Sequence, residues 1–384
     1  MITFDAVTKR YPDGTVAVDA LDLEVPGGKT MVLVGPSGCG KTTSLRMINR
    51  LVEPSQGTIL LDGTDIKDRH PALLRRGIGY VIQQSGLFPH RTVEDNIATV
   101  PVLNGWPRKK ARERARELLG LVGLEPALAK RYPHQLSGGQ QQRVGVARAL
   151  AADPPVLLMD EPFSAVDPVV RASLQDQLLS LQAELRKTIV LVTHDIEEAI
   201  KVGDLVALFR PHGKLAQLSP PEELLAAPVD DYVAGFVGFD RGIRRLSFVS
   251  TAGLTLAAGP VVPADTTVKT ALAAGEPWLC VIGPDRRPRG WVDTARLAAL
   301  PGDTPLAGVP ADASGHAFTV GKDSLRAALD AAVLSPAGQA VGVDGDGRVL
   351  GVATFDQVRA AIQAQAAQAQ AAQAQAAQAG DSRP

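Results

Sequence analysis

The chain has 384 residues, more than one hydrophobic core usually organises, so we expect at least two domains. Its 40 basic and 41 acidic residues give a net charge of -1, which leaves no electrostatic footprint for nucleic acid, and we expect no nucleic-acid partner. Cys39 and Cys280 are the two cysteines and lie far apart in the sequence, which fits a reducing, cytosolic setting. The first residues lack a basic segment followed by an apolar one, so we expect no signal peptide. No stretch approaches the roughly 20 apolar residues of a membrane helix, so we expect any membrane role to pass through a partner.

The first thirty residues alternate apolar and polar side chains around turns, which predicts a small antiparallel sheet. Tyr11 stands next to a Pro-Asp-Gly turn. The sequence leaves open whether this tyrosine is an exposed aromatic or part of the core. Residues 57–66 predict a further hairpin.

A glycine loop follows the apolar run of residues 31–34 and leads into a helical stretch. Its spacing, G-x-x-x-x-G-K-T, is that of a phosphate-binding loop. Glycines let consecutive backbone N–H groups turn toward an anion, and the following helix presents its positive end to the same point. Lys41 would reach the outer phosphates and the Thr42 hydroxyl would ligate Mg²⁺. The loop consists of Gly35, Pro36, Ser37, Gly38, Cys39, Gly40, Lys41, Thr42 and Thr43.

Two stretches between the loop and residue 130 have simple patterns. Residues 78–84 predict a strand that runs into polar residues, and residues 85–90 predict a loop. Residues 107–122 predict an amphipathic helix with a solvated face rich in arginine, a pattern that fits a nucleic-acid role less well.

A second glycine turn, Leu-Ser-Gly-Gly-Gln, precedes a helical stretch at residues 144–150. Ser137 stands where an N-cap would, and Gly138 and Gly139 lie in the first turn, where they weaken the helix and expose backbone donors. The stretch is therefore either a second anion-binding turn or a plain capped helix.

Carboxylates and a histidine follow the ends of two predicted buried strands. The strand at residues 156–159 ends at Asp160 and Glu161, at the edge where parallel sheets bind ligands. Asp160 is placed to hold Mg²⁺ and Glu161 to polarise an attacking water. The strand at residues 188–193 ends at His194. A lone histidine is usually structural, but this position at the same sheet edge favours a functional one.

Together these motifs resemble the nucleotide-binding subunit of an ABC transporter over roughly residues 1–240. The resemblance implies an α/β P-loop ABC ATPase domain: a parallel sheet core, an antiparallel β subdomain and a helical subdomain, with ATP and Mg²⁺ as cofactors. It further implies that Tyr11 stacks on adenine, Gln83 contacts Mg²⁺ and the attacking water, Glu161 is the catalytic base, Asp167 contacts the facing subunit, and His194 senses the γ-phosphate.

The family resemblance also implies a head-to-tail homodimer. Each ATP would be enclosed between residues 35–43 of one chain and Ser137, Gly138, Gly139 and Gln140 of the other. Mg²⁺ would be held by Thr42, Gln83 and Asp160. ATP would close the dimer because both surfaces are built around phosphate charge, and hydrolysis would reopen it.

The sequence of residues 78–90 looks most like that of the importer branch for glycine betaine, carnitine, choline and proline. That resemblance implies an ATP-hydrolysing subunit at the cytoplasmic face of the membrane. It would be attached through transmembrane permease subunits and served by an extracytoplasmic substrate-binding protein. Two alternatives stay open: an importer ATPase for another small solute, and an ABC ATPase acting on ribosomes or DNA. The latter usually carries two cassettes or a long coiled coil, and this chain has neither pattern.

The remaining chain predicts a basic linker at residues 241–250 and two weakly similar stretches within residues 251–362, each reading helix, strand, turn, strand, helix. This α+β pattern resembles a tandem CBS pair, a regulatory module that often binds adenine nucleotides. A nucleotide-binding half of such a pair usually ends in Gly-x-x-Thr-x-x-Asp, and the Asp contacts the ribose. Neither half here has that carboxylate in register, and the second half reads Thr354-Phe355-Asp356-Gln357. Sensing of ionic strength or support of a dimer are the alternatives. Residues 363–384 repeat Gln and Ala and predict a low-complexity tail.

Overall fold

The computed structural model describes residues 1–83, 86–164, 166–313 and 315–364. The chain divides into two compact units, Met1–Phe239 and a second unit that begins at Asp240. Gln84, Ser85, Ala165 and the tail prediction for residues 365–384 lie outside the described residues.

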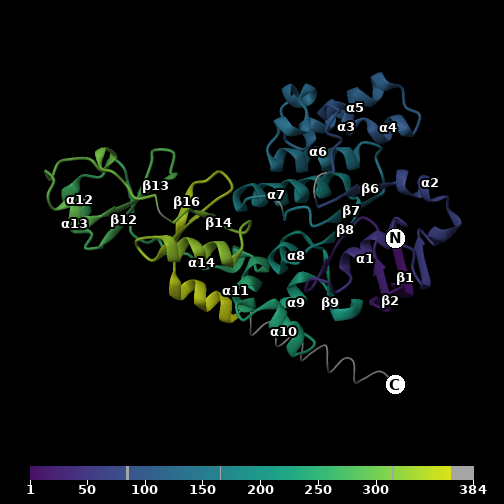
Figure 1. Cartoon of the computed structure of the whole chain (residues 1–384). Coiled ribbons are helices and arrows are strands. Elements are labelled where there is room, and N and C mark those ends of the chain that lie inside the picture. The colour runs from purple at the N-terminus through teal and green to yellow at the C-terminus, as the bar shows by residue number, and fades with distance from the viewer. Residues whose placement is uncertain (84–85, 165, 314, 365–384) are drawn as a thin grey trace. The chain divides into compact units, whose positions relative to one another are not determined.

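A six-stranded sheet forms the centre of the first unit (Figure 1). In spatial order its strands are β10 (Lys214–Ser219), β9 (Leu205–Arg210), β3 (Thr30–Val34), β8 (Thr188–Val192), β7 (Val156–Asp160) and β6 (Ile78–Val81). All neighbours pair in parallel except β10, which is antiparallel at the edge. β3, β7 and β8 are buried along their whole length, as expected for strands covered on both faces. The predicted parallel core is confirmed.

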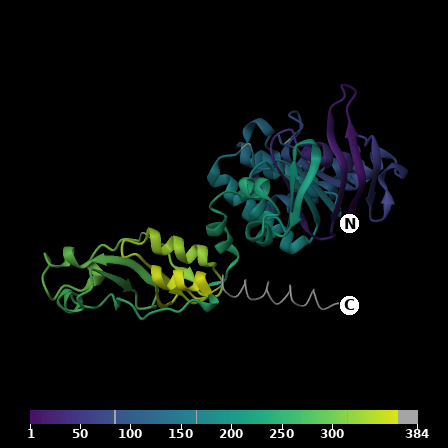
Figure 2. The ribbon, with the colours of Figure 1, turned by 90° about the horizontal axis from the view of Figure 1, so that it is seen from below.

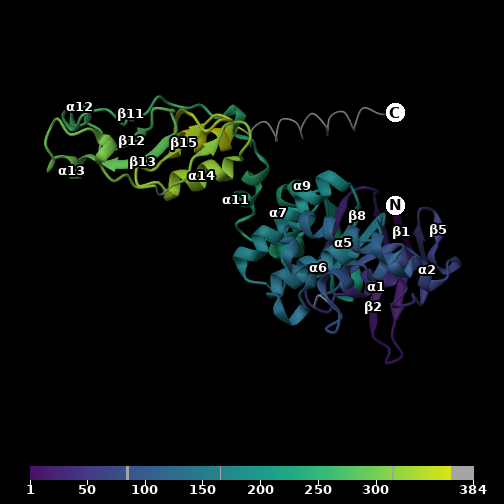
Figure 3. The same ribbon diagram turned by 90° about the horizontal axis from the view of Figure 1, so that it is seen from above.

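A second, four-stranded sheet is antiparallel and confirms the predicted β subdomain. In spatial order it contains β2 (Val16–Val25), β1 (Ile2–Arg10), β4 (Gln56–Leu61) and β5 (Thr64–Asp65). Its buried side chains share a core with those of α1 (Lys41–Ile48) and one face of the central sheet. Figure 3 shows the β1–β2 hairpin, coloured purple, projecting from this unit.

Helices cover the other face of the central sheet, and α3 to α6 gather in one lobe (Figure 1). This lobe is the predicted helical subdomain, and its α5 corresponds to the amphipathic helix predicted at residues 107–122. The helices after α1 are α2 (Pro71–Arg76), α3 (Val93–Ile97), α4 (Thr99–Leu103), α5 (Arg108–Leu121), α6 (Gly138–Leu150), α7 (Pro168–Leu185), α8 (Ile196–Val202), α9 (Pro221–Ala226) and α10 (Asp231–Val237), with 3₁₀ turns at Ile66–Asp68, Pro126–Lys130, Pro133–Gln135 and Pro211–Gly213.

The second unit contains two three-stranded sheets that lie side by side, each with its own helices (Figure 2). The first repeat comprises β11 (Val261–Pro263), α12 (Val268–Ala273), β12 (Trp278–Ile282), β13 (Pro288–Asp293) and α13 (Thr294–Leu297). The second comprises β14 (Phe318–Thr319), α14 (Leu325–Leu334), β15 (Gln339–Val343), β16 (Val349–Thr354) and a helix at 355–364. Further 3₁₀ turns of this unit lie at Thr251–Gly253 and Leu306–Gly308.

The two repeats share a detail that extends their predicted similarity. Trp291 exchanges two backbone hydrogen bonds of 2.7 Å with Asp312, and Val352 exchanges bonds of 2.8 and 2.9 Å with Ala257. Gly290 and Gly351 precede these positions, and a Cβ at either glycine would lie 2.5 Å from a carbonyl oxygen of the paired loop. The two repeats therefore share the same backbone hydrogen-bond pairing at equivalent positions.

The structure differs from the sequence prediction at the two ends of this unit. Within the predicted linker, Arg241–Arg245 form α11 and Leu246–Phe248 a 3₁₀ turn. Leu246 and Val249 are buried in the core beneath α14, so apolar burial outweighs the basic composition of this stretch. Residues 363–364, predicted as tail, continue the helix that begins at residue 355.

Candidate functional site

The phosphate loop connects the buried strand β3 to α1, as predicted. Three of its glycines have positive φ: 151° at Gly35, 77° at Gly38 and 97° at Gly40. A Cβ on Gly35 would lie 2.7 Å from Phe209 O and one on Gly40 would lie 2.2 Å from Ala17 O, whereas at Gly38 nothing lies within 4 Å. The loop is thus packed tightly at both ends and open in its middle, which leaves room for an anion over its N–H groups.

Lys41 begins α1 and its side chain folds back over the loop. Its Nζ donates to the carbonyl oxygens of Gly35 and Pro36, at 2.8 Å each, and the residue is only 6% exposed. Burial raises the pKa of the Cys39 thiol, although the charge of Lys41 opposes this shift. The cysteine is therefore a neutral packing residue, and the lysine holds the only charge within the loop.

Asp160, at the end of β7, lies against the first turns of α1. Asp160 is 4% exposed, and its carboxylate accepts a 2.9 Å hydrogen bond from Thr42 Oγ1 and lies 3.4 Å from the guanidinium of Arg46. Tyr80 from β6 lies beside this pair, and burial raises the pKa of its phenol. Sequence reasoning missed Arg46 and Tyr80. Arg46 follows Thr42 by one helical turn, so it faces the same side of α1, a spacing that could have indicated it.

Glu161, Gln83 and His194 form one contiguous group. Gln83 Nε2 donates to Glu161 Oε2 at 2.9 Å, and His194 Nδ1 lies 3.3 Å from Glu161 Oε1. Glu161 has φ of 46°, a conformation rare for a residue with a side chain, and its N–H donates to Val192 O of β8 at 2.9 Å. Such backbone strain is often found at functional positions. The three strands β6, β7 and β8 therefore bring the three predicted residues to one point.

The Leu-Ser-Gly-Gly-Gln turn begins α6 with reciprocal capping. Ser137 Oγ accepts from Gln140 N at 3.3 Å, and Gln140 Oε1 accepts from Ser137 N at 3.0 Å. Gly139 packs against α7, where a Cβ would lie 2.6 Å from Val170, while Ser137 and Gly138 are exposed. The side chains of this turn thus bond to one another, not to the phosphate loop of the same chain.

Asp167 and Tyr11 occupy two separate positions. Asp167 caps α7, since its Oδ1 accepts from Val170 N at 3.0 Å. Tyr11 is 36% exposed at the end of the β1–β2 hairpin, and Lys9 Nζ lies 5.3 Å from the centre of its ring. Of the two possibilities that the sequence left open for this tyrosine, the structure supports the exposed one.

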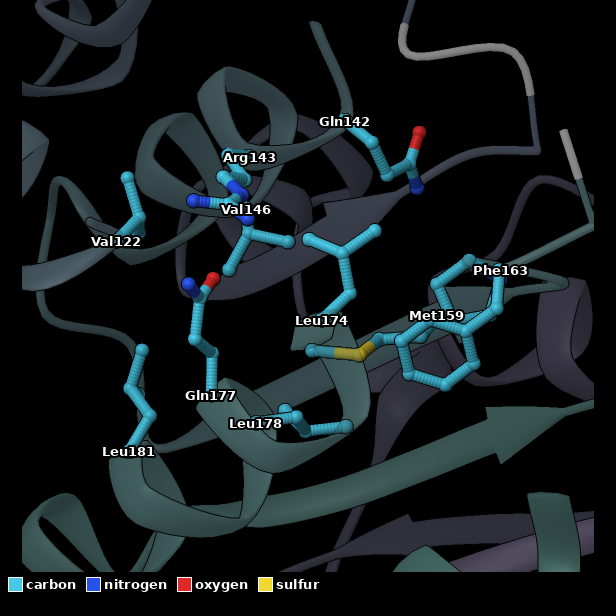
Figure 4. A pocket seen from close by; sticks show the side chains of 11 residues that line it. Val122, Gln142, Arg143, Val146, Met159, Phe163, Leu174, Gln177, Leu178 and Leu181 are labelled. Atoms are coloured by element: carbon cyan, nitrogen blue, oxygen red, sulfur yellow. The ribbon is translucent and has the colours of Figure 1, made fainter. Parts of the chain in front are cut away.

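A small cavity of about 30 Å³ lies between α6 and α7 (Figure 4). None of the predicted site residues lines it, and its walls are largely apolar. The lining residues are Val122, Gln142, Arg143, Val146, Met159, Pro162, Phe163, Leu174, Gln177, Leu178 and Leu181.

The donor set around Asp160 suits a hard cation. Mg²⁺ prefers oxygen ligands and usually retains waters and phosphate oxygens. Thr42 and Asp160 supply protein oxygens at the mouth of the phosphate loop. Among the residues that the structure describes, no group of three or more His, Cys, Asp or Glu side chains could hold a metal. Two protein oxygens leave most positions around such a cation to waters or to the phosphate oxygens of a bound nucleotide.

Comparisons with known proteins also indicate a nucleotide-binding chain. The ABC transporter family model matches residues 18–164. The chain is 44% identical to the osmoprotectant import ATP-binding protein of Salmonella typhimurium, over 93% of this chain and 95% of that protein. The chain belongs to the family of ATP-binding subunits of ABC transporters. It is thus an ABC-type ATPase, and ATP is its nucleotide.

Further relatives agree with this assignment. The glycine betaine/carnitine/choline transport ATP-binding protein of Bacillus subtilis is 50% identical over 71% of this chain and 72% of its own length. A solved structure described as a dimeric post-hydrolysis state of an ATP-binding cassette, bound to ADP and Pi, is 34% identical with a TM-score of 0.53. It covers 58% of this chain and 99% of its own. Over the described residues, none of the helices is long and apolar enough to span a membrane.

Proposed function

We propose that this chain energises the import of an osmoprotectant, a quaternary amine of the glycine betaine, carnitine and choline class or proline, through a partner permease. The names of the relatives support the solute class: osmoprotectant import in one and glycine betaine, carnitine and choline transport in another, each at 44% identity or more. The observation that carries the ATPase role is the group of Glu161, Gln83 and His194 at the edge of the sheet that also bears the phosphate loop.

In this proposal the phosphate loop binds the nucleotide through backbone donors of residues 35–43, with Lys41 on the outer phosphates and Tyr11 on adenine. The exposure of Tyr11 supports that stacking role. Thr42, Asp160 and Gln83 hold Mg²⁺, which when bound neutralises developing phosphate charge. Glu161 accepts a proton from the attacking water, Gln83 orients that water, and His194 contacts the γ-phosphate.

We further propose that two copies act head to tail. Ser137, Gly138, Gly139 and Gln140 of one copy would face the phosphate loop of the other, and Asp167 would lie at the contact between copies. The capped turn supports this, because its exposed first residues present a positive helix end without a partner in their own chain's phosphate loop. The dimeric description of a solved relative also favours it.

A groove on the helical lobe supports attachment to transmembrane permease subunits. It has a volume of about 460 Å³ and lies beside Phe88, Val102 and Leu103, which are 40%, 37% and 55% exposed. Arg91 and Arg108 line the same groove. Arg112 also lines the groove and pairs with Asp95, so the arginines outnumber the one carboxylate. Apolar side chains with this surplus of cations suit a short cytoplasmic segment of the permease that carries an apolar residue and a carboxylate. The chain would then act peripherally at the cytoplasmic face, with an extracytoplasmic binding protein delivering the solute.

For the domain boundaries we propose an ABC domain at residues 1–240 and a tandem CBS-like regulatory domain at residues 251–362. The paired sheets and the matching backbone exchanges at Trp291 and Val352 support the tandem arrangement. The buried Leu246 and Val249 favour counting residues 241–250 with the second unit.

The proposal is tested by identifying the partner proteins of the chain and by measuring its ATP hydrolysis. The tagged chain, recovered from membranes in mild detergent, should retain a multi-span permease, and the complex should hydrolyse ATP when a glycine betaine-binding protein is present. Glu161→Gln should lower turnover by about 10²–10⁴ while leaving ATP bound. Recovery of ribosomes or DNA-binding proteins in place of a permease would contradict the transport assignment, and unchanged turnover in Glu161→Gln would contradict the assigned base.

A further inference from the structure

Behind His194 lies a buried polar cluster to which the site described above assigns no role. It joins the end of β8 to the first turns of α7 and α8. Thr193 is 1% exposed and Glu198 is 5% exposed, so both side chains are shielded from water. Polar groups buried this deeply cost free energy unless they are satisfied, so their arrangement is tightly constrained.

Thr193 Oγ1 makes two hydrogen bonds that hold the loop around His194. It donates a 2.6 Å hydrogen bond to Glu198 Oε2 and accepts one of 3.1 Å from Asp195 N. The backbone N–H of Thr193 donates to Leu33 O of β3 at 3.1 Å. The residues immediately before and after His194 are therefore fixed, and its backbone sits at the apex of a closed turn. The imidazole itself is 58% exposed and depends on this turn for its direction.

Arg171 extends the cluster to α7. Its guanidinium lies 3.8 Å from both Glu198 Oε1 and Asp195 Oδ2, and its backbone N–H donates to Asp167 O at 2.8 Å. Its Nε is buried and makes no hydrogen bond. At this distance the charges attract without a formed hydrogen bond. Arg171 thus lies one helical turn after Asp167 and in charge contact with the turn that carries His194.

We propose that Glu198 and Arg171 are positioning residues, which hold His194 against Glu161 and connect it to the first turn of α7. Burial raises the pKa of the Glu198 carboxyl, and the hydrogen bond from Thr193 and the charge of Arg171 oppose this. The role rests on the proposed function of His194. Because Asp167 is placed at the contact between copies in that proposal, movement of α7 would be transmitted to the imidazole through Arg171.

The test compares Glu198→Ala, which removes the acceptor of Thr193, with Glu198→Gln, which keeps an acceptor and removes the charge. In Glu198→Ala we expect kcat for ATP to fall between about tenfold and a hundredfold, the loss typical of a misplaced catalytic group, with KM nearly unchanged. Glu198→Gln should fall between this variant and the parent. Asp176→Asn is the matched control, since Asp176 joins α7 to α8 through an exposed 2.8 Å ion pair with Lys201, and it should retain parental activity.

A double-mutant cycle separates positioning from general stability. If Glu198 acts through His194, then Glu198→Ala should change the residual rate of His194→Ala by less than about twofold. Equal losses in both backgrounds would overturn the proposal. A second measurement does not need activity: the ring resonance of His194 in ¹³C-histidine-labelled chain should move in Glu198→Ala and Thr193→Val but not in Asp176→Asn.

The two readouts distinguish failure of this inference from failure of the proposed function. An unmoved His194 resonance in a folded Glu198→Ala chain would refute the positioning role, whatever the rate. A moved resonance together with parental turnover would keep the structural connection and contradict the role of His194 in hydrolysis.

Discussion

Gly40 gives the sharpest prediction about how the phosphate loop is built. Its φ is 97° and ψ is -1°, and an added Cβ would lie 2.2 Å from Ala17 O and 3.2 Å from Val18 Cγ2 of β2. The left-handed backbone costs an alanine about 1–2 kcal/mol. Relieving the contact with a backbone oxygen adds about 1–3 kcal/mol, as overpacking usually does. Gly40→Ala should therefore lower the free energy of unfolding by about 2–5 kcal/mol.

Gly38 provides a matched control in the same loop. Its φ is 77°, so Gly38→Ala carries the same backbone cost, but nothing lies within 4 Å of its added Cβ. We expect a loss of about 1–2 kcal/mol from backbone strain alone. The difference between the two variants isolates the contact of Gly40 with β2.

The assay is thermal unfolding of the full chain without nucleotide, followed by circular dichroism, with the second unit as an internal reference. A loss of 1 kcal/mol corresponds to about 2–4 °C for a unit of this size. Gly40→Ala should also weaken ATP binding at least about tenfold, because any shift of Gly40 moves Lys41 and Thr42. Equal melting temperatures for Gly38→Ala and Gly40→Ala would refute the steric reasoning.

Three further predictions concern other parts of the chain. Ser137→Ala removes the N-cap of α6 and should cost about 1 kcal/mol in a thermal melt, whereas Ser180→Ala at an exposed position of α7 should stay within about 0.5 kcal/mol. Val249→Asp should lower the melting transition of the second unit alone, since Val249 is buried in that unit's core; an unchanged transition would restore the linker interpretation. Burial raises the pKa of Glu198 above its ordinary value of 4.5, so the folded chain keeps this proton at pH values where the unfolded chain has lost it. The contribution of Glu198 to the free energy of unfolding should therefore fall as pH rises from that ordinary value through the raised one, and denaturant titrations of Glu198→Gln should show a flatter profile there.

The residues of the candidate site were predictable because each follows a strong local signal. A glycine spacing or the end of a buried strand marks Lys41, Asp160, Glu161 and His194, and parallel strands bring such ends to one edge without further information. The residues that support them were not predictable in the same way. Arg46 and Glu198 face the site from helices whose sequence patterns give only an ordinary polar position. Their roles depend on which helix lies against which strand end, and this is fixed by tertiary packing.

In the second unit, some secondary structure also depends on tertiary packing and could not be predicted from the sequence. The hairpins β12–β13 and β15–β16 were predicted by the helix, strand, turn, strand, helix pattern of the two repeats, yet β11 and β14 escaped prediction. These strands span only Val261–Pro263 and Phe318–Thr319, and each pairs in parallel with the first strand of its hairpin. Strands of two or three residues carry no periodicity, so their extended form follows from the partner that receives their hydrogen bonds. The same dependence explains residues 241–250, where two apolar side chains within a basic stretch are buried because α14 offers them a core.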